Sequence, residues 1–125
     1  MNLSYPSWRC VVSGPNTMDE VTPEGALGLQ AAGGVLLDVR EHDERAAGHA
    51  PGAVHVPLAE VGGATSRFDG QQVLAVCRSG GRSAKAAELL ATAGIDVRNV
   101  AGGMTSWAEA GLPVVRDDGS PGAIA

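Results

Sequence analysis

Aromatic residues are scarce in this chain of 125 residues, where two Trp, one Tyr and one Phe make up 3% of the composition. Proteins that bind single-stranded nucleic acid stack bases on aromatic side chains, so this composition argues against that class. The hydrophobic core must instead be built from Ala, Val and Leu.

Positive charge is also in short supply. Nine Lys and Arg face 14 Asp and Glu, which gives a formal net charge of −5. An acidic chain is repelled by phosphate backbones and by anionic membrane surfaces. We therefore predict no nucleic-acid or membrane partner and expect a small molecule as the partner.

Cysteine and long hydrophobic runs are nearly absent. Cys10 and Cys77 are too few for the disulfide framework of a small secreted domain, although they could form one bridge. The first residues show neither a basic start nor the apolar stretch of a signal peptide, and no later run approaches membrane-spanning length. A reducing compartment fits this pattern, and we expect a cytoplasmic protein.

The remaining composition predicts one folded domain. Hydrophobic residues make up 44% of the chain and charged residues 18%, values that allow an ordinary buried core. We predict an N-terminal extension over residues 1–17 and a domain over residues 18–115. Residues 116–125 are polar and rich in Pro and Gly, and we expect them to form a flexible C-terminal tail.

Short apolar runs alternate with stretches of helical character, and Gly, Pro or small polar residues separate them. The runs predict strands over residues 35–39, 53–56, 73–77 and 96–100. Helices are expected from Pro23 to the glycines at 33–34 and over residues 83–93 and 104–110, with shorter turns over 41–48 and 58–61. This alternation predicts an α/β fold, in which crossover connections favour a parallel sheet flanked by helices.

The strongest chemical signal is a loop between an apolar strand and the start of a helix, which is where open α/β sheets bind ligands. Its glycines allow successive backbone N–H groups to face inward, and the helix start adds partial positive charge, so the loop should favour an anion. We call this segment the Cys77 loop; it consists of Cys77, Arg78, Ser79, Gly80, Gly81, Arg82 and Ser83.

Cys77 is the candidate nucleophile of this loop. Beside Arg78 and Arg82 its thiol should lose a proton more readily than a free thiol does. A single cysteine in an apolar run is more commonly an inert buried residue that closes a strand. The surrounding loop favours the reactive interpretation.

Three chemistries use a thiolate in an anion-binding loop, and the spacing distinguishes among them. Cysteine phosphatases need an Arg six positions after the Cys, where this chain has Ser83, so the loop is one residue short. Thiol–disulfide exchange of the thioredoxin type needs a second nearby Cys, which is missing here. A tighter loop suits a smaller object, and a single sulfur atom carried on Cys77 as a persulfide fits it.

The sequence resembles the rhodanese-like sulfurtransferases over about residues 18–115, through three motifs in order. The first is an Asp-x-Arg-Glu stretch at Asp38 that leads to Gly-His-x-Pro-Gly-Ala at Gly48. The second is the Cys77 loop, which is similar to the six-residue active-site loop of the family. The third is Gly-Gly-x-x-x-Trp from Gly102 to Trp107, followed by Gly-Leu-Pro at Gly111.

This resemblance implies an α/β domain with a central, mainly parallel sheet of about five strands. It implies that Cys77 accepts the sulfur, that the loop from Arg78 to Ser83 holds the persulfide, and that Asp38 and Arg40 support the pocket. No cofactor is implied beyond the transient persulfide, and the spacing of the His residues predicts no metal site. Family members often carry an aromatic residue at the position of Arg45 and a larger aliphatic residue at that of Ala50, so we expect a more positive and more open pocket rim.

The expected function is the transfer of a sulfane sulfur from a small anionic donor such as thiosulfate to cyanide, a thiol or a sulfur-carrier protein. The alternative is a protein-binding or sulfur-sensing module without significant turnover, and a phosphatase is disfavoured by the loop length. We expect a monomer or a homodimer. Cys10 is either a resolving thiol or, as we favour, an incidental surface cysteine.

Overall fold

The computed structural model describes residues 19–125. The predicted N-terminal extension and Cys10 lie outside the described residues. None of the helices within the described part of the chain has both the length and the apolar character needed to span a lipid bilayer.

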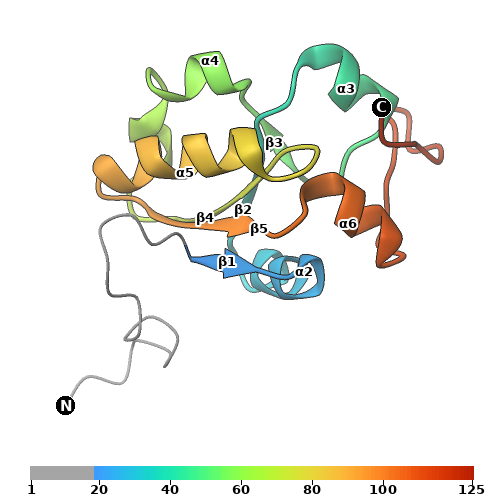
Figure 1. The fold of residues 1–125 in the computed structure, drawn as a ribbon, viewed down its shortest axis with the longest axis horizontal. Helices are drawn as coiled ribbons and strands as arrows, with labels where there is room; N and C mark the ends of the chain where they lie inside the picture. The colour runs from blue at the N-terminus through green and yellow to red at the C-terminus, as the bar shows by residue number, and fades with distance from the viewer. Residues whose placement is uncertain (1–18) are drawn as a thin grey trace.

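Five parallel strands form one sheet at the centre of the molecule (Figure 1). The strands are β1 (Glu20–Val21), β2 (Val35–Asp38), β3 (Val54–His55), β4 (Gln72–Val76) and β5 (Asp96–Val100). Their order across the sheet is β1-β5-β4-β2-β3, so the apolar strand β4 lies in the middle. This architecture confirms the predicted α/β fold and its parallel sheet.

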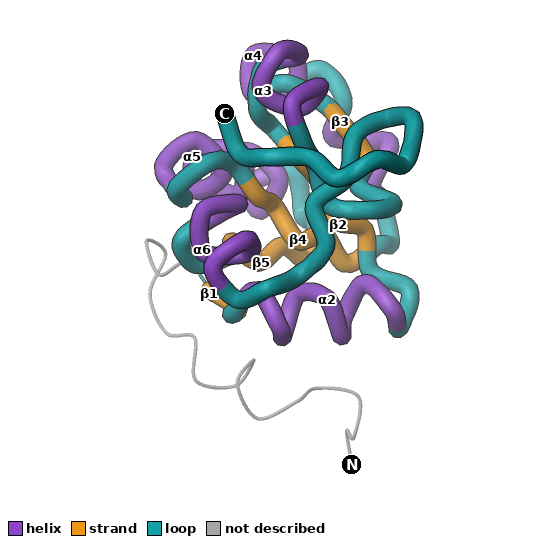
Figure 2. Tube along the Cα trace, turned by 90° about the vertical axis from the view of Figure 1, so that its right-hand side faces the viewer, coloured by secondary structure: helices purple, strands orange, loops and turns teal. Residues whose placement is uncertain are grey.

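Helices cover both faces of the sheet, as Figures 1 and 2 show from two directions. One face carries α4 (Leu58–Val61) and α5 (Gly81–Thr92), and the other carries α2 (Pro23–Ala31) and α6 (Gly103–Glu109). Two short segments complete the fold: α3 (His42–Ala47), between β2 and β3, and the 3-10 helix η1 (Thr65–Phe68), before β4.

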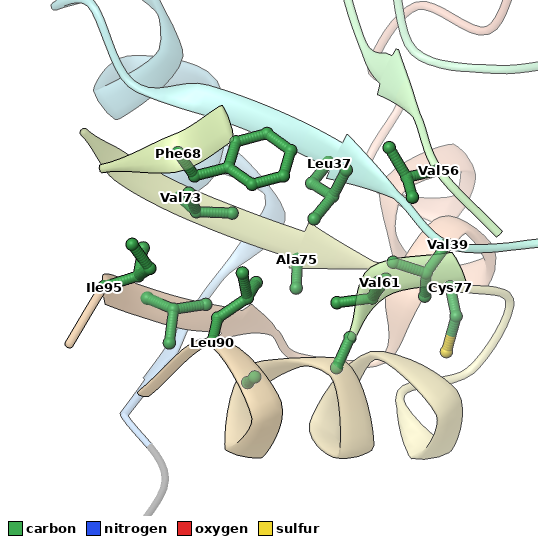
Figure 3. Close-up of a cluster of buried hydrophobic side chains, with 13 residues drawn as sticks. Leu37, Val39, Val56, Val61, Phe68, Val73, Ala75, Cys77, Leu90 and Ile95 are labelled. Carbon is green, nitrogen blue, oxygen red and sulfur yellow. The ribbon is translucent and has the colours of Figure 1, made fainter. Parts of the chain in front are cut away.

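The core is divided into two clusters because side chains alternate along each strand. From β4, Val73 and Ala75 point to the α5 face, whereas Leu74 and Val76 point to the face of α2 and α6. Cys77 follows the same alternation and joins the α5 cluster at one end (Figure 3). The periodicity of the central strand therefore places the sulfur beneath the start of α5.

Local signals in the sequence explain several element boundaries. The hydroxyl of Thr22 accepts a hydrogen bond from the Gly25 amide at 3.0 Å, so Thr22 is the N-cap of α2 as expected. Helix α5 begins at Gly81, two residues earlier than predicted. Gly80 adopts a left-handed backbone with φ of 118°, and its carbonyl accepts the Ala84 amide at 3.1 Å, which starts the helix.

Residues 116–125 fold back onto the domain. The amide of Gly122 donates to the carbonyl of Val114 at 2.9 Å, and the amide of Ala123 donates to the carbonyl of Ala47 at 3.0 Å. Asp117 also binds Arg45 on α3, with an oxygen–nitrogen distance of 2.8 Å. These contacts attach residues 116–125, which we expected to form a flexible tail, to the domain. They depend on pairings with residues 45–49, which local composition does not reveal.

Candidate functional site

The Cys77 loop leaves the carboxyl end of β4 and enters α5 (Figure 1). Cys77 is 1% exposed, and in Figure 3 it lies beside Val39 and Val61, with its sulfur near the first turn of α5. The strand fixes the residue from one side and the helix start covers it from the other. This is the position at which open α/β sheets place their ligands.

Hydrogen-bond donors surround the sulfur. The amide of Gly80 lies 3.0 Å from the Cys77 sulfur and donates to it, and the hydroxyl oxygen of Ser83 lies 3.3 Å from the same atom. The left-handed conformation of Gly80 turns its amide inward, a conformation that a side chain would strain. The loop can therefore stabilise negative charge on sulfur.

The balance of burial and hydrogen bonding lowers the pKa of the Cys77 thiol. Burial raises this pKa, but the hydroxyl of Ser83 and the backbone amides of Ser83, Gly80 and Ser79 together lower it by more. A thiolate of depressed pKa is a nucleophile and can carry a covalent intermediate. The predicted ease of ionisation thus has a physical basis in the loop backbone and one hydroxyl.

The start of α6 holds the beginning of the loop. The amides of Met104 and Thr105 donate to the carbonyls of Cys77 and Arg78, at 2.7 and 3.0 Å. Gly103 makes this approach possible, because a Cβ at that position would lie 2.4 Å from the Cys77 carbonyl oxygen. The Gly-Gly pair of the third sequence motif therefore contacts the Cys77 loop, although the pair follows Cys77 by 25 residues in the chain.

The two loop arginines have different surroundings. Arg82 donates two hydrogen bonds to the carboxylate of Glu44 on α3, at 2.6 and 2.8 Å. This pairing lowers the pKa of Glu44 to about 2 and raises that of Arg82. The side chain of Arg78 is exposed and makes no hydrogen bond or ion pair with any residue between 19 and 125. Arg82 braces the loop, and Arg78 is the charge available to a ligand.

The remaining loop residues, Ser79 and Gly81, contribute to the site through their backbone and not through side chains. Ser79 is exposed and acts on the sulfur through its amide. Gly81 is the exposed first residue of α5. The structure thus places the seven predicted loop residues in one loop at the Cys77 sulfur, with the Arg82 side chain bound to Glu44 and the Arg78 side chain without a partner among residues 19–125.

Asp38 and Arg40 form a fully buried ion pair in which Arg40 donates to both carboxylate oxygens, at distances from 2.7 to 3.2 Å. Arg40 also donates to the carbonyl of Gly48 at 2.7 Å and to that of Glu44 at 3.4 Å. The pair therefore holds α3 and the turn after it, the segment that carries the carboxylate bound to Arg82. Its support of the loop is indirect.

Two polar residues at the site were not predicted from the sequence. Glu44 stands 38 positions before the arginine that it binds, and a carboxylate in an acidic helix start is usually a surface residue. Asn99 in β5 has its side-chain oxygen 2.6 Å from the hydroxyl oxygen of Ser83. A polar side chain near the carboxyl end of a buried strand was the one available signal for Asn99.

The expected open pocket rim is wrong at Ala50, and the positive charge expected from Arg45 has an acidic partner. Ala50 is fully buried in the cluster of α2 and α6, where it packs in the core instead of lining a rim. Arg45 is paired with Asp117, so much of its charge is compensated. The C-terminal segment, which the sequence analysis left out of the domain, supplies that compensation.

The histidines take part in local structure. His55 hydrogen-bonds the carbonyl of Arg40 through Nε2 at 2.7 Å, and His49 hydrogen-bonds that of Arg45 through Nδ1 at 3.1 Å. Between residues 19 and 125, no group of three His, Cys, Asp or Glu side chains is arranged to hold a metal ion. Trp107 is buried, and its ring nitrogen donates to the carbonyl of Pro113 at 2.8 Å, as expected for a residue that packs the last helix.

Comparisons with known proteins agree with this geometry. Residues 22–110 match the model of the rhodanese-like domain. The chain is 37% identical over 99 residues to thiosulfate sulfurtransferase 16, chloroplastic, of Arabidopsis thaliana, and the match covers 68% of this chain and 82% of that protein. It is also 37% identical over 107 residues to an HTH-type transcriptional regulator of Mycobacterium tuberculosis, a match that covers 82% of this chain and 46% of that protein.

A solved structure shows the same fold. The rhodanese-related protein of Thermoplasma volcanium superposes with a TM-score of 0.71 at 30% identity, covering 78% of this chain and 97% of that one. The chain spans less than half of the regulator but most of the plant sulfurtransferase and of the solved structure. The chain therefore belongs to the rhodanese-like domain family.

Proposed function

We propose that this protein is a sulfurtransferase that takes a sulfane sulfur from a small anionic donor such as thiosulfate onto Cys77 and passes it to a thiophilic acceptor. The observation that supports the proposal is the hydrogen bonding of the Cys77 sulfur. The sulfur accepts a hydrogen bond from the Gly80 amide at 3.0 Å and lies 3.3 Å from the Ser83 hydroxyl oxygen. These two donors stabilise the anionic thiolate, and the inward-facing amides of the loop suit the charged terminal sulfur of a persulfide.

The reaction has two displacement steps. In the first, the Cys77 thiolate attacks the outer sulfur of thiosulfate, a sulfur–sulfur bond forms to Cys77, and the bond to the sulfonate breaks with its electron pair to release sulfite. In the second, an acceptor such as cyanide or a thiolate attacks the terminal sulfur and restores the Cys77 thiolate. Each step breaks one bond to the transferred sulfur as it forms another and leaves no electrons over, so neither step needs an external oxidant or reductant.

Arg78 is the residue that we assign to donor binding. It is exposed beside Cys77 and carries a charge that no other described residue compensates. Arg82 is unsuited to this role because both ends of its guanidinium are bound by Glu44. The acceptor is cyanide, a small thiol or a sulfur-carrier protein, and a reducing compartment such as the cytoplasm would keep Cys77 in its active form.

The second candidate is a sulfur-sensing module in which the same persulfide forms without turnover. The specific observation that favours it is the match to a transcriptional regulator, of which this chain spans 46%. In that case the domain would report the persulfide to another part of a longer protein or to a partner.

Measurement of sulfite release separates the two candidates. Purified protein is mixed with thiosulfate, with and without cyanide or a thiol acceptor, and sulfite and thiocyanate are counted per protein molecule. A sulfurtransferase releases many sulfites per Cys77 when the acceptor is present, and Cys77→Ser releases none. One sulfite per protein with either acceptor would favour the sensing module. Rapid hydrolysis of a phosphate monoester, lost in Cys77→Ser, would contradict both.

A further inference from the structure

A buried polar pair lies beneath the Cys77 loop. Ser83 in the first turn of α5 is 0% exposed, and Asn99 in β5 is 3% exposed. The hydroxyl oxygen of Ser83 and the side-chain oxygen of Asn99 are 2.6 Å apart. Buried polar groups are kept only where they have hydrogen-bond partners, so this contact defines the orientation of both side chains.

The orientation of the Asn99 amide follows from its second contact. Its Nδ2 lies 3.3 Å from the carbonyl oxygen of Gly80. A carbonyl oxygen only accepts hydrogen bonds, so the amide nitrogen must face Gly80 and the amide oxygen must face Ser83. The amide oxygen also only accepts, and the Ser83 hydroxyl therefore donates to it.

The Ser83 hydroxyl has one hydrogen and three acceptors within reach, among which the Gly80 carbonyl oxygen at 3.2 Å belongs to its own helix turn and the other two belong to Asn99 and Cys77. Its oxygen lies 3.3 Å from the Cys77 sulfur as well as 2.6 Å from the Asn99 oxygen. While it donates to Asn99 it can only accept from the sulfur, which suits a protonated thiol whose S–H donates. A thiolate or any other negatively charged sulfur has no hydrogen to give and needs the hydroxyl as a donor.

We propose that Asn99 is a positioning residue for Cys77: its amide oxygen competes with the sulfur for the single hydrogen of Ser83, and this hydrogen turns toward the sulfur when the sulfur is charged and back to Asn99 when it is not. Ser83 then favours the anionic sulfur, and Asn99 favours the uncharged sulfur through the same hydroxyl. Ser83 and Asn99 therefore have opposite effects on the ionisation of Cys77, although both are polar residues beside the same sulfur.

The competition has a consequence for sulfur transfer, and this part rests on the proposed function. When the Cys77 sulfur attacks the donor, it forms a sulfur–sulfur bond, and the negative charge moves to the terminal sulfur. The Cys77 sulfur itself becomes uncharged, so the hydroxyl hydrogen returns to Asn99. Asn99 therefore stabilises the persulfide state relative to the thiolate and promotes loading.

The charged groups around the sulfur stay the same in every variant used to test this proposal. Arg82 interacts electrostatically with Cys77 and is paired with Glu44 from α3, which also faces the Glu41 backbone. Arg78 is exposed in the loop, and the buried pair of Asp38 and Arg40 belongs to β2 and the residues after it. Replacement of Ser83 or Asn99 by an uncharged residue adds and removes no charge.

The test is the pH dependence of Cys77 alkylation by iodoacetamide, which requires no sulfur donor. The full chain carries Cys10→Ser so that Cys77 is its one thiol. Ser83→Ala should raise the apparent pKa of Cys77 by about one unit, because the thiolate loses a donor. Asn99→Leu, close in shape but without the amide, should lower it by about half a unit. Asn99→Ala serves the same purpose if the Leu variant does not fold.

A double variant separates competition from mere structural support. Asn99 contacts both the Ser83 hydroxyl and the Gly80 carbonyl, and we assign its effect on the sulfur to the hydroxyl, so Ser83→Ala with Asn99→Leu should have the pKa of Ser83→Ala alone. A rise in pKa in Asn99→Leu or Asn99→Ala would overturn the proposal. A change caused by the Asn99 substitution that persists in the Ser83→Ala background would overturn it too, since it would show a role independent of the hydroxyl.

Sulfur loading is measured in parallel on the same proteins. Under conditions where Cys77 is fully ionised, Asn99→Leu should release the first sulfite about threefold more slowly than the parent. If the parent itself accepts no sulfur while the alkylation pattern is as predicted, the proposed function fails and the competition for the Ser83 hydrogen stands. If the parent accepts sulfur but the predicted alkylation pattern is absent, the proposed function stands and the competition for the Ser83 hydrogen is disproved.

Discussion

The carboxylate of Glu44 accepts two hydrogen bonds from the guanidinium of Arg82, at 2.6 and 2.8 Å, and so ties α3 to the Cys77 loop. The backbone of Glu44 is also bound, because its carbonyl accepts a hydrogen bond from the Arg40 side chain at 3.4 Å. Arg40 is paired with Asp38 at the end of β2. A line of alternating charges therefore connects the end of β2 to the first turn of α5.

Loss of the Glu44 charge should reduce stability in a pH-dependent way. The folded-state pKa of Glu44 is lowered from its usual 4.5 to about 2 by Arg82. Its contribution is therefore fully present above about pH 5 and is lost as the pH falls toward about 2. The pair is partly exposed, so Glu44→Gln should cost about 1 kcal/mol in the free energy of unfolding near neutral pH.

The measurement is urea unfolding of the parent and of Glu44→Gln over this pH range, with Glu60→Gln on α4 as the control. The gap between parent and variant should close as the pH falls. A gap that is constant at all pH values would show that the side chain acts through packing and not through its charge.

Arg78→Ala should weaken the use of thiosulfate without affecting the fold. The side chain is exposed and has no partner among residues 19–125, so the melting temperature should change little. Removal of a solvent-screened charge beside the donor should raise KM about fivefold, equivalent to about 1 kcal/mol, with a smaller effect on kcat. Arg116→Ala, which removes a cation elsewhere on the surface, is the control. Unchanged kinetics in Arg78→Ala would mean that this arginine faces away from the donor.

Gly103→Ala should displace the Cys77 loop. The added Cβ would lie 2.4 Å from the Cys77 carbonyl oxygen, and Gly103 also has a positive φ of 61°. Gly111 has a positive φ of 78° with no atom near its Cβ direction, so Gly111→Ala carries the backbone strain alone, about 1 to 2 kcal/mol.

The two alanine variants are compared by thermal unfolding and by the rate of Cys77 alkylation. Gly103→Ala should be the less stable, and its alkylation at neutral pH should be slower by about tenfold or more. Equal behaviour of the two variants would show that the loop does not depend on its close contact with α6.

Asp38→Asn should be the most destabilising of the substitutions considered. Asp38 and Arg40 are both fully buried, and removal of one charge leaves the other without compensation in the interior. The expected loss is about 3 to 5 kcal/mol, a large part of the stability of a small domain. Asp117→Asn breaks a pair whose carboxylate is 68% exposed and should cost at most about 1 kcal/mol. Similar melting temperatures for the two variants would contradict the structural role of the buried pair.

The sheet and the Cys77 loop could be predicted because their signals are local. Strand β4 is a continuous apolar run, and the glycines after Cys77 stand next to the residue that they position. The facing of alternate side chains then follows from strand geometry, whereas the order of the strands and the two-residue strand β1 were not predicted.

The partners of the loop could not be predicted because they are distant in the chain. Glu44 and Asn99 reach the loop from 38 and 16 positions away and occupy segments whose local patterns are those of an ordinary helix and strand. The same limit explains the tail, where the hydrogen bond from the Ala123 amide to the Ala47 carbonyl depends on where the fold places residue 47. Pairings of this kind are set by tertiary packing, which overrides local composition.

The central claim, that Cys77 receives the sulfur, is tested most directly by the intact mass of the purified protein after incubation with thiosulfate. The mass is read before and after treatment with a reductant, and the modified residue is located by peptide mapping of the parent, Cys77→Ser and Cys10→Ser. We expect the addition of one sulfur atom on Cys77, its removal by reductant, and its persistence in Cys10→Ser. A sulfur atom found on Cys10 alone, or added equally to Cys77→Ser, would contradict the account.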